Sequence, residues 1–93
     1  MITKDDRTDE QKQDLCVLVV GTDSFMSGWG MAEGGASVAA WACTPDDAYR
    51  VERWVRNRGD MKRVRVVSAK GYRPRNARHF HIYAAGPGHP ATA

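Results

Sequence analysis

The sequence lacks three features that would each place it in a large class of proteins. It has two cysteines in 93 residues, too few for the disulfide framework of a small secreted domain. Its longest unbroken apolar run, residues 15–20, has six residues, whereas a membrane-spanning helix needs about 20. The first fourteen residues are polar and do not resemble a secretory signal. We therefore expect a cytoplasmic protein with reduced thiols and no membrane segment.

Recognisable catalytic and cofactor motifs are also missing. A chain of 93 residues forms one small domain, with little interior for a deep cofactor site. The glycines within residues 28–35 are not followed by the Lys-Ser/Thr pair of a phosphate-binding loop, and no G-x-S-x-G elbow supplies a nucleophile. Cys16 and Cys43 fall in apolar segments, which favours packing over a reactive thiolate. The sequence thus predicts a non-catalytic protein without a cofactor.

Four segments have the composition of β-strands. Residues 15–20 form a continuous, mostly β-branched run that ends at Gly21, which favours a central strand covered on both faces. Residues 37–43 form a weaker second strand. Residues 63–67 and 79–83 alternate polar with apolar side chains, as half-exposed strands do.

One helix is predicted between the second and third strands. Thr44 suits the N-cap, Pro45 suits the first helical position, and the two aspartates that follow suit the positive end of the helix dipole. An apolar stripe with helical spacing comes next, and Gly59 supplies the left-handed residue that ends a helix. The stripe consists of Ala48, Val51 and Val55, with Trp54 beside it.

These elements predict an α+β fold. About four strands and one helix in the order ββαββ make a small two-layer sandwich, in which the helix packs on one face of a mainly antiparallel sheet. The single domain covers residues 14–85. Residues 1–13 and 86–93 lack apolar periodicity and are predicted to be flexible tails.

The last predicted strand carries a pair of histidines. His79 and His81 share one strand face with Tyr83, while Phe80 and Ile82 share the other. Two imidazoles on one face occur in metal sites. A metal would need further ligands from the C-terminal tail, a cysteine or a carboxylate, so we expect a plain surface here and no metal site.

The net charge of +3 hides an uneven distribution along the chain. Residues 1–44 contain three basic and seven acidic side chains, a net charge of −4, whereas residues 45–80 contain eleven basic and four acidic ones, a net charge of +7. Such a surplus suits contact with nucleic acid or with an acidic protein face, and it also suits a plain solvated surface.

Arginines in the basic half are candidates for one nucleic-acid-binding patch, in which aromatic side chains would stack on bases. The sequence has neither the glycine-aromatic signature of an RNA-recognition motif nor the second helix of a helix-turn-helix. The candidate residues are Arg50, Arg53, Arg63, Arg65, Tyr72, Arg73, Arg75 and Arg78, with His79, His81 and Tyr83 as further stacking groups.

The loop between the first two strands concentrates large apolar side chains among glycines. Residues 21–35 contain five glycines together with Phe25, Met26 and Trp29. If these side chains are exposed, they would anchor in the groove of a partner. If the loop folds back, they would complete the core of a domain that is barely large enough to have one.

Two strings in this region carry a resemblance. DSFMSGWGMAEG at residues 23–34 and RNRGDMKRV at residues 56–64 resemble a group of small hypothetical proteins from bacteriophages and mobile elements, which share a D-x-F-x-S-G-W-G-x-A-E-G signature. The likeness covers roughly residues 17–67. It implies an accessory role in a bacterial host cell and carries no assigned catalytic residues. Small proteins of that origin often inhibit host defence, and anti-CRISPR proteins are among them.

We therefore predict a stoichiometric inhibitor that occupies a surface of a host defence complex, with a CRISPR effector as the most specific target suggested. The alternative is a small basic protein that binds nucleic acid directly through the arginine patch. The oligomeric state stays open between monomer and homodimer. The predicted partner-binding residues are Phe25, Met26, Trp29, Arg63, Arg65, Arg73, Arg75 and Arg78.

Overall fold

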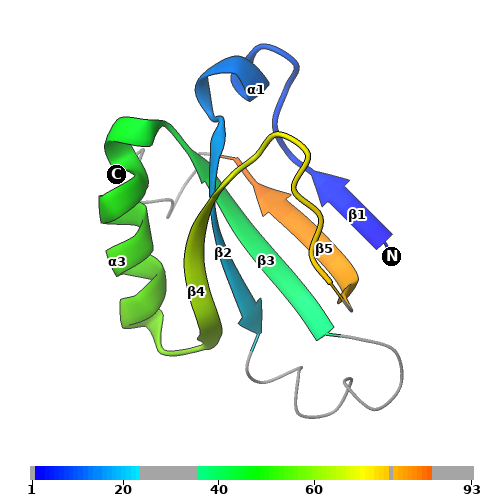
Figure 1. Cartoon of the computed structure of the whole chain (residues 1–93), viewed down its shortest axis with the longest axis vertical. Helices are drawn as coiled ribbons and strands as arrows, with labels where there is room; N and C mark the ends of the chain where they lie inside the picture. Colours follow the sequence, from blue (N-terminus) through cyan, green and yellow to red (C-terminus); the bar gives the residue numbers. More distant parts are fainter. Residues whose placement is uncertain (1, 24–35, 76, 85–93) are drawn as a thin grey trace.

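A computed structural model describes residues 2–23, 36–75 and 77–84, in which five strands form one mixed sheet (Figure 1). The sheet order is β1-β5-β3-β2-β4. Strand β2 pairs antiparallel with β3 and β4, whereas β5 pairs parallel with β3 and β1. The strands are β1 (Ile2–Asp5), β2 (Val17–Asp23), β3 (Ala36–Cys43), β4 (Met61–Ser68) and β5 (Ala77–Tyr83). The helices are α1 (Gln11–Asp14), the 3-10 turn η2 (Pro45–Asp47) and α3 (Ala48–Arg58).

The predicted α+β class is confirmed, but the predicted sheet needs two corrections. The strand count was too low, because the edge strand β1 lies within the segment that was assigned to a flexible N-terminal tail. The order ββαββ therefore omits the first strand. The mainly antiparallel arrangement is also wrong, because two of the four strand pairings are parallel. The predicted C-terminal tail, residues 86–93, lies outside the described residues.

Strand β1 is fastened to the rest of the domain by ionic and backbone contacts. The Arg7 guanidinium donates to both carboxylate oxygens of Asp5, at 3.0 and 2.8 Å, and to the carbonyl of Leu15 at 2.9 Å. These bonds, opposed in part by burial, hold the pKa of Asp5 below its usual value. The Asp6 carboxylate lies 2.8 Å from Nε2 of His81 on β5. A four-residue strand with little apolar content is thus held by local contacts of Arg7 and by a contact of the adjoining Asp6 with His81, which is distant in sequence.

Two apolar cores lie on opposite faces of the sheet. Alternate residues of β2 enter one core or the other, so this strand is covered on both faces, as its apolar run predicted. The core beneath α3 consists of Val19, Trp41, Cys43, Val51, Val55 and Val64. The core on the opposite face consists of Leu18, Val20, Val38, Ala40, Ala42, Phe80 and Ile82.

Helix α3 follows from the local signals in its sequence. Val51 and Val55 are fully buried against the sheet, as their spacing predicts. The turn at Pro45–Asp47 is a 3-10 turn that leads into the α-helix, and Gly59 ends it with a left-handed φ of 78°. None of the helices in residues 2–23, 36–75 and 77–84 is long and apolar enough to cross a membrane.

The connection between β4 and β5 covers the face of the sheet opposite α3. The two strands run in the same direction but are separated by β2 and β3, so the chain must cross the sheet between them. Residues 69–75 make this crossing in front of the sheet in Figure 1. Tyr72 packs edge-on against Phe80, with ring centroids 5.8 Å apart. We call residues 69–75 the crossing connection.

Candidate nucleic-acid interface

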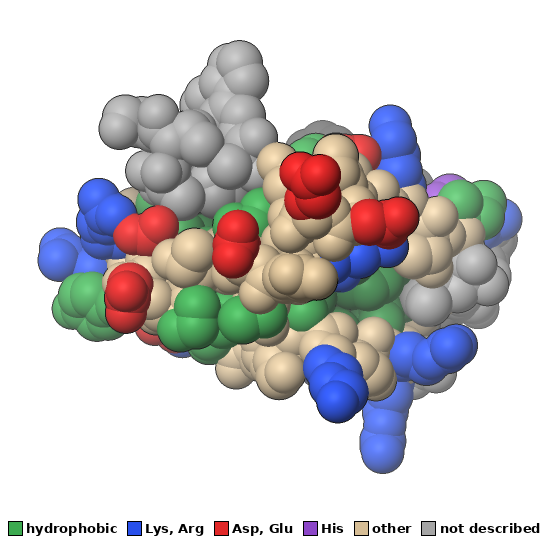
Figure 2. Space-filling model, turned by 90° about the horizontal axis from the view of Figure 1, so that it is seen from above, with side chains coloured by type: hydrophobic (Ala, Val, Ile, Leu, Met, Phe, Trp, Pro, Cys, Tyr) green, Lys and Arg blue, Asp and Glu red, His purple; other side chains and the backbone are tan. Residues whose placement is uncertain are grey.

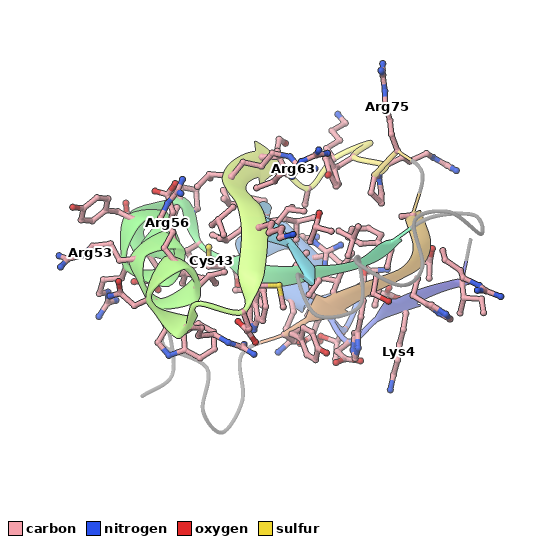
Figure 3. The ribbon with its side chains drawn as sticks, turned by 90° about the horizontal axis from the view of Figure 1, so that it is seen from below. Lys4, Cys43, Arg53, Arg56, Arg63 and Arg75 are labelled. Atoms are coloured by element: carbon pink, nitrogen blue, oxygen red, sulfur yellow. The ribbon has the colours of Figure 1, made fainter. Side chains whose placement is uncertain are left out.

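A groove lined by arginines lies on the face that the crossing connection covers. Its volume is about 450 Å³. Figure 3 shows Arg63 and Arg75 on the same side of the sheet, away from Lys4. We call this cavity the arginine groove, and its lining residues are Thr22, Val38, Arg63, Arg65, Tyr72, Arg73, Pro74 and Arg75.

One wall of the groove comes from an irregular part of β4. The pairing between β2 and β4 shifts register between Val20 and Thr22, and Arg63 takes a left-handed φ of 55° at this point. Gly21 permits the close approach, because a Cβ atom there would lie 2.9 Å from Cβ of Met61. The bulge thus fixes the place from which the Arg63 side chain leaves the sheet.

The other wall comes from the crossing connection, and Arg65 joins the two walls. Nη2 of Arg65 donates to the Tyr72 hydroxyl at 2.5 Å, and Nη1 donates to the Arg63 carbonyl at 2.9 Å. The Arg65 guanidinium carbon lies 5.8 Å from the centre of the Tyr72 ring. Because the Tyr72 ring also packs on the core, these contacts tie the groove to the fold.

The charge of the groove is not neutralised within the described part of the chain. There, none of the four groove arginines forms an ion pair with a carboxylate. The arginines of α3 differ, because each of three forms an ion pair with a nearby acid. These pairs are Arg50–Asp47, Arg56–Glu52 at 3.0 Å and Arg58–Asp60 at 2.8 Å.

Acidic side chains gather at the end of the molecule that carries α1. Asp9, Glu10 and Asp14 are exposed there. Figure 2 looks onto this end and shows several acidic side chains grouped on it. The groove reaches the other end of the sheet, where β2 finishes near Thr22 and β3 begins. This separation of charge would orient a polyanion towards the groove and away from α1.

The structure brings together most, but not all, of the predicted nucleic-acid-binding residues. Arg63, Arg65, Tyr72, Arg73 and Arg75 all line the arginine groove. Four of these five were also predicted to steer a protein partner.

The remaining predicted residues do not join this set. Arg50 and Arg53 lie on α3, which packs on the opposite face of the sheet, so the single patch expected to include them is not formed (Figure 3). Arg78 lies in β5 and does not line the groove. The predicted apolar anchors Phe25, Met26 and Trp29 lie outside the described residues.

A second cavity lies on the α3 side of the sheet, beyond the part that the helix covers. Its volume is about 440 Å³, and we call it the aromatic pocket. Parallel pairing of β3 with β5 places Trp41 opposite Tyr83, which the sequence did not reveal because the partner strands were unknown. The lining residues are Ser37, Val38, Ala39, Trp41, Arg58, Asp60, Met61, His79, His81 and Tyr83.

The two cysteines have different environments. Cys43 is buried beneath α3, and burial, with a smaller effect of Asp47, raises the pKa of its thiol to about 11. A thiol held neutral in this way is a poor nucleophile at neutral pH. Cys16 is exposed just before β2, contrary to its predicted packing in a strand. In the described ranges, no three His, Cys, Asp or Glu side chains are arranged to hold a metal ion.

Comparisons with protein-family models, with curated proteins and with solved structures find no match to this chain. The function must therefore be argued from its own residues.

Proposed function

We propose that this protein is a non-catalytic binding protein that holds nucleic acid in the arginine groove. The observation that supports the proposal is the gathering of four guanidinium groups, none of them paired with a described carboxylate, around one cavity. Guanidinium groups bind phosphate oxygens through two parallel hydrogen bonds, so such a groove suits a phosphodiester backbone.

Unpaired arginines are better suited to this task than paired ones. A phosphate that approaches Arg50 or Arg56 must compete with a carboxylate already in contact. A phosphate that approaches Arg73 or Arg75 displaces only water and mobile counterions. The release of those counterions supplies much of the binding free energy and makes it depend on salt.

The alternative that the sequence favoured, inhibition of a host defence complex, places different demands on the surface. Energetically important centres of protein interfaces are usually aromatic or apolar and become fully desolvated. The arginine groove contributes four cations and few apolar side chains. The apolar anchors expected for an inhibitor lie outside the described residues, and the preference for nucleic acid is argued from the arginines of the groove.

The experiment is a titration of a fluorescent 20-nucleotide single strand, and of its duplex, with binding measured by anisotropy between 25 and 200 mM salt. If three or four phosphates are contacted, the logarithm of the association constant should fall with the logarithm of salt concentration with a slope of about −2 to −3 for the single strand. Replacing Arg73 and Arg75 together with alanine should make the slope shallower by about 1.4.

A matched control separates the groove from overall charge. The double variant R50A/R53A also removes two positive charges, but it removes them from α3. It should leave the slope nearly unchanged. Absence of binding at 25 mM salt, or an equal loss in both double variants, would overturn the proposal. A chain that fails to bind either oligonucleotide but inactivates a purified CRISPR effector at a one-to-one ratio would be the predicted inhibitor instead.

A further inference from the structure

The aromatic pocket lies on the opposite face of the sheet from the arginine groove and has no part in the proposal above. We propose that it binds a nucleobase, which would make the preferred ligand of this protein a single-stranded nucleic acid. The inference rests on the proposed function for the identity of the ligand. Its geometry comes from different residues.

Three planar side chains form a column in and beneath this pocket. The rings of Trp41 and Tyr83 are stacked, with centroids 5.5 Å apart and planes 19° from parallel. The rings of Tyr83 and His81 are also stacked, at 3.8 Å and 24°. Trp41 is only 5% exposed and forms the base, whereas Tyr83 is 37% exposed. Tyr83 is the middle ring of this column, so a further ring would stack on the outer face of His81. A column of nearly parallel rings favours such a flat ring over a branched aliphatic side chain.

The column is held in place from both sides. Arg58 lies 5.0 Å from the ring centre of Trp41 and equally close to that of Trp54, which meets Trp41 edge-on. On the other side, Nε2 of His81 lies 2.8 Å from the Asp6 carboxylate. Side chains fixed in this way lose little conformational entropy when a ligand binds.

The rim of the pocket carries hydrogen-bonding groups of both kinds. Ser37 donates and accepts, Arg58 donates, and Asp60 accepts, and all three line the cavity with His79. The edge of a nucleobase also carries both donors and acceptors, so it matches a polar rim better than an aliphatic side chain does. The volume of about 440 Å³ lies in the range of small-molecule sites.

These features select an unpaired base. In a duplex, both faces of each base are stacked and its pairing edge is occupied, so a base must leave the helix before it can enter a pocket. Val38 lines both the aromatic pocket and the arginine groove, so the two cavities reach the same end of the sheet. A single strand could therefore be held by its backbone at one site and by a base at the other.

The test uses adenosine, which has a base but no phosphate, and ribose 5-phosphate, which has a phosphate but no base. We expect adenosine to shift the NMR signals of the Tyr83 and His81 rings and to give nuclear Overhauser contacts with the His81 ring. Tyr83→Leu keeps an apolar cover on Trp41 but removes the ring on which His81 stacks, and it should weaken adenosine binding about fivefold or more. Tyr49→Leu is the matched control, because Tyr49 is a 68% exposed tyrosine on α3 outside both cavities.

The outcomes separate this inference from the proposed function. If adenosine contacts neither ring, or if both tyrosine variants weaken adenosine binding equally, the base site is wrong, and binding of oligonucleotides through Arg73 and Arg75 is unaffected by that result. If adenosine binds at His81 and oligonucleotides do not bind, the pocket stands and the proposed function fails. If N-acetyltryptophanamide occupies the pocket and adenosine does not, the ligand is a protein side chain and the inference is overturned. The nuclear Overhauser contacts use the unaltered protein, so the test does not depend on whether Tyr83→Leu folds.

Discussion

Tyr72 should be essential to the stability of this domain, although it lies in a connection between strands. Its ring packs edge-on against Phe80 and covers the core that faces away from α3. Its hydroxyl accepts a hydrogen bond from Arg65 at the groove. The substitutions Tyr72→Ala and Tyr72→Phe separate these roles, because only the first removes the ring.

The size of the effect follows from the partial burial of the ring. A tyrosine side chain buries about 150–250 Å² when fully covered, so half coverage corresponds to roughly 100 Å² and about 2.5 kcal/mol. The edge-on contact with Phe80 adds about 0.5–1.5 kcal/mol, and residual burial in the unfolded chain subtracts a similar amount. We expect Tyr72→Ala to lower the free energy of unfolding by about 2–3 kcal/mol. For a domain of this length, that corresponds to a fall in Tm of roughly 10–20 °C.

The stability of both variants can be measured by thermal and urea unfolding, with circular dichroism as the signal. Tyr72→Phe keeps the ring and loses one exposed hydrogen bond, so its stability should fall by less than about 1 kcal/mol. If Tyr72→Ala melts within a few degrees of Tyr72→Phe, the ring does not secure the crossing connection. The groove would then lack the rigid wall on which its argument depends.

Four further predictions concern stability and reactivity. Iodoacetamide at pH 8 should modify exposed Cys16 in the native protein but spare buried Cys43, as mass spectrometry can show; equal labelling would contradict the burial. Burial raises the pKa of Cys43 from 9.0 to about 11, so the thiol ionises in the unfolded chain at a lower pH than in the folded protein. The free energy of unfolding should therefore fall between pH 9 and 11, which urea midpoints can measure. Gly21→Ala should cost about 1–3 kcal/mol, since its Cβ would press on Met61, and an unchanged urea midpoint would refute this close approach. Because the folded state lowers the pKa of Asp5 below its ordinary value of 3.8, ionised Asp5 stabilises the fold above pH 3.8, and this stabilisation is lost as pH falls through the folded-state pKa. Asp5→Asn should therefore reduce the pH dependence of the urea midpoint below about pH 4.

The sequence predicted those elements whose signals are local. The apolar stripe of the helix and its end at Gly59 were predicted correctly, whereas the α-helix begins at Ala48, after the 3-10 turn that contains Pro45. Each of the four predicted strands coincides in large part with an observed strand. The division of β5 into a buried face and a polar face also followed from alternation alone, since Phe80 and Ile82 are buried.

The features that it did not predict depend on which strands become neighbours. Strand β1 has only four residues and pairs with β5 across most of the length of the chain, so no local pattern identifies it. The stacking of Trp41 on Tyr83 requires the parallel register of β3 with β5, which no local pattern in either strand reveals. The sequence placed the two histidines of β5 on one strand face. It did not reveal the aromatic pocket, because the pocket depends on this register.

The arginine groove shows how the two kinds of information combine. Arg50 and Arg56 lie three and four residues from acids, so their ion pairs could be read from the helical spacing, and Arg58 pairs with Asp60 just beyond the helix. Residues 61–93 contain no acidic residue, so the arginines of β4 and the crossing connection have none within their own segment. Neutralisation would require acids from elsewhere, and exposed acids gather instead near α1. The fold then brings the two groups of arginines together, because β4 and β5 run in the same direction and the connection must cross the sheet beside Arg65. A concentrated positive charge in this groove is thus a consequence of composition and strand direction together.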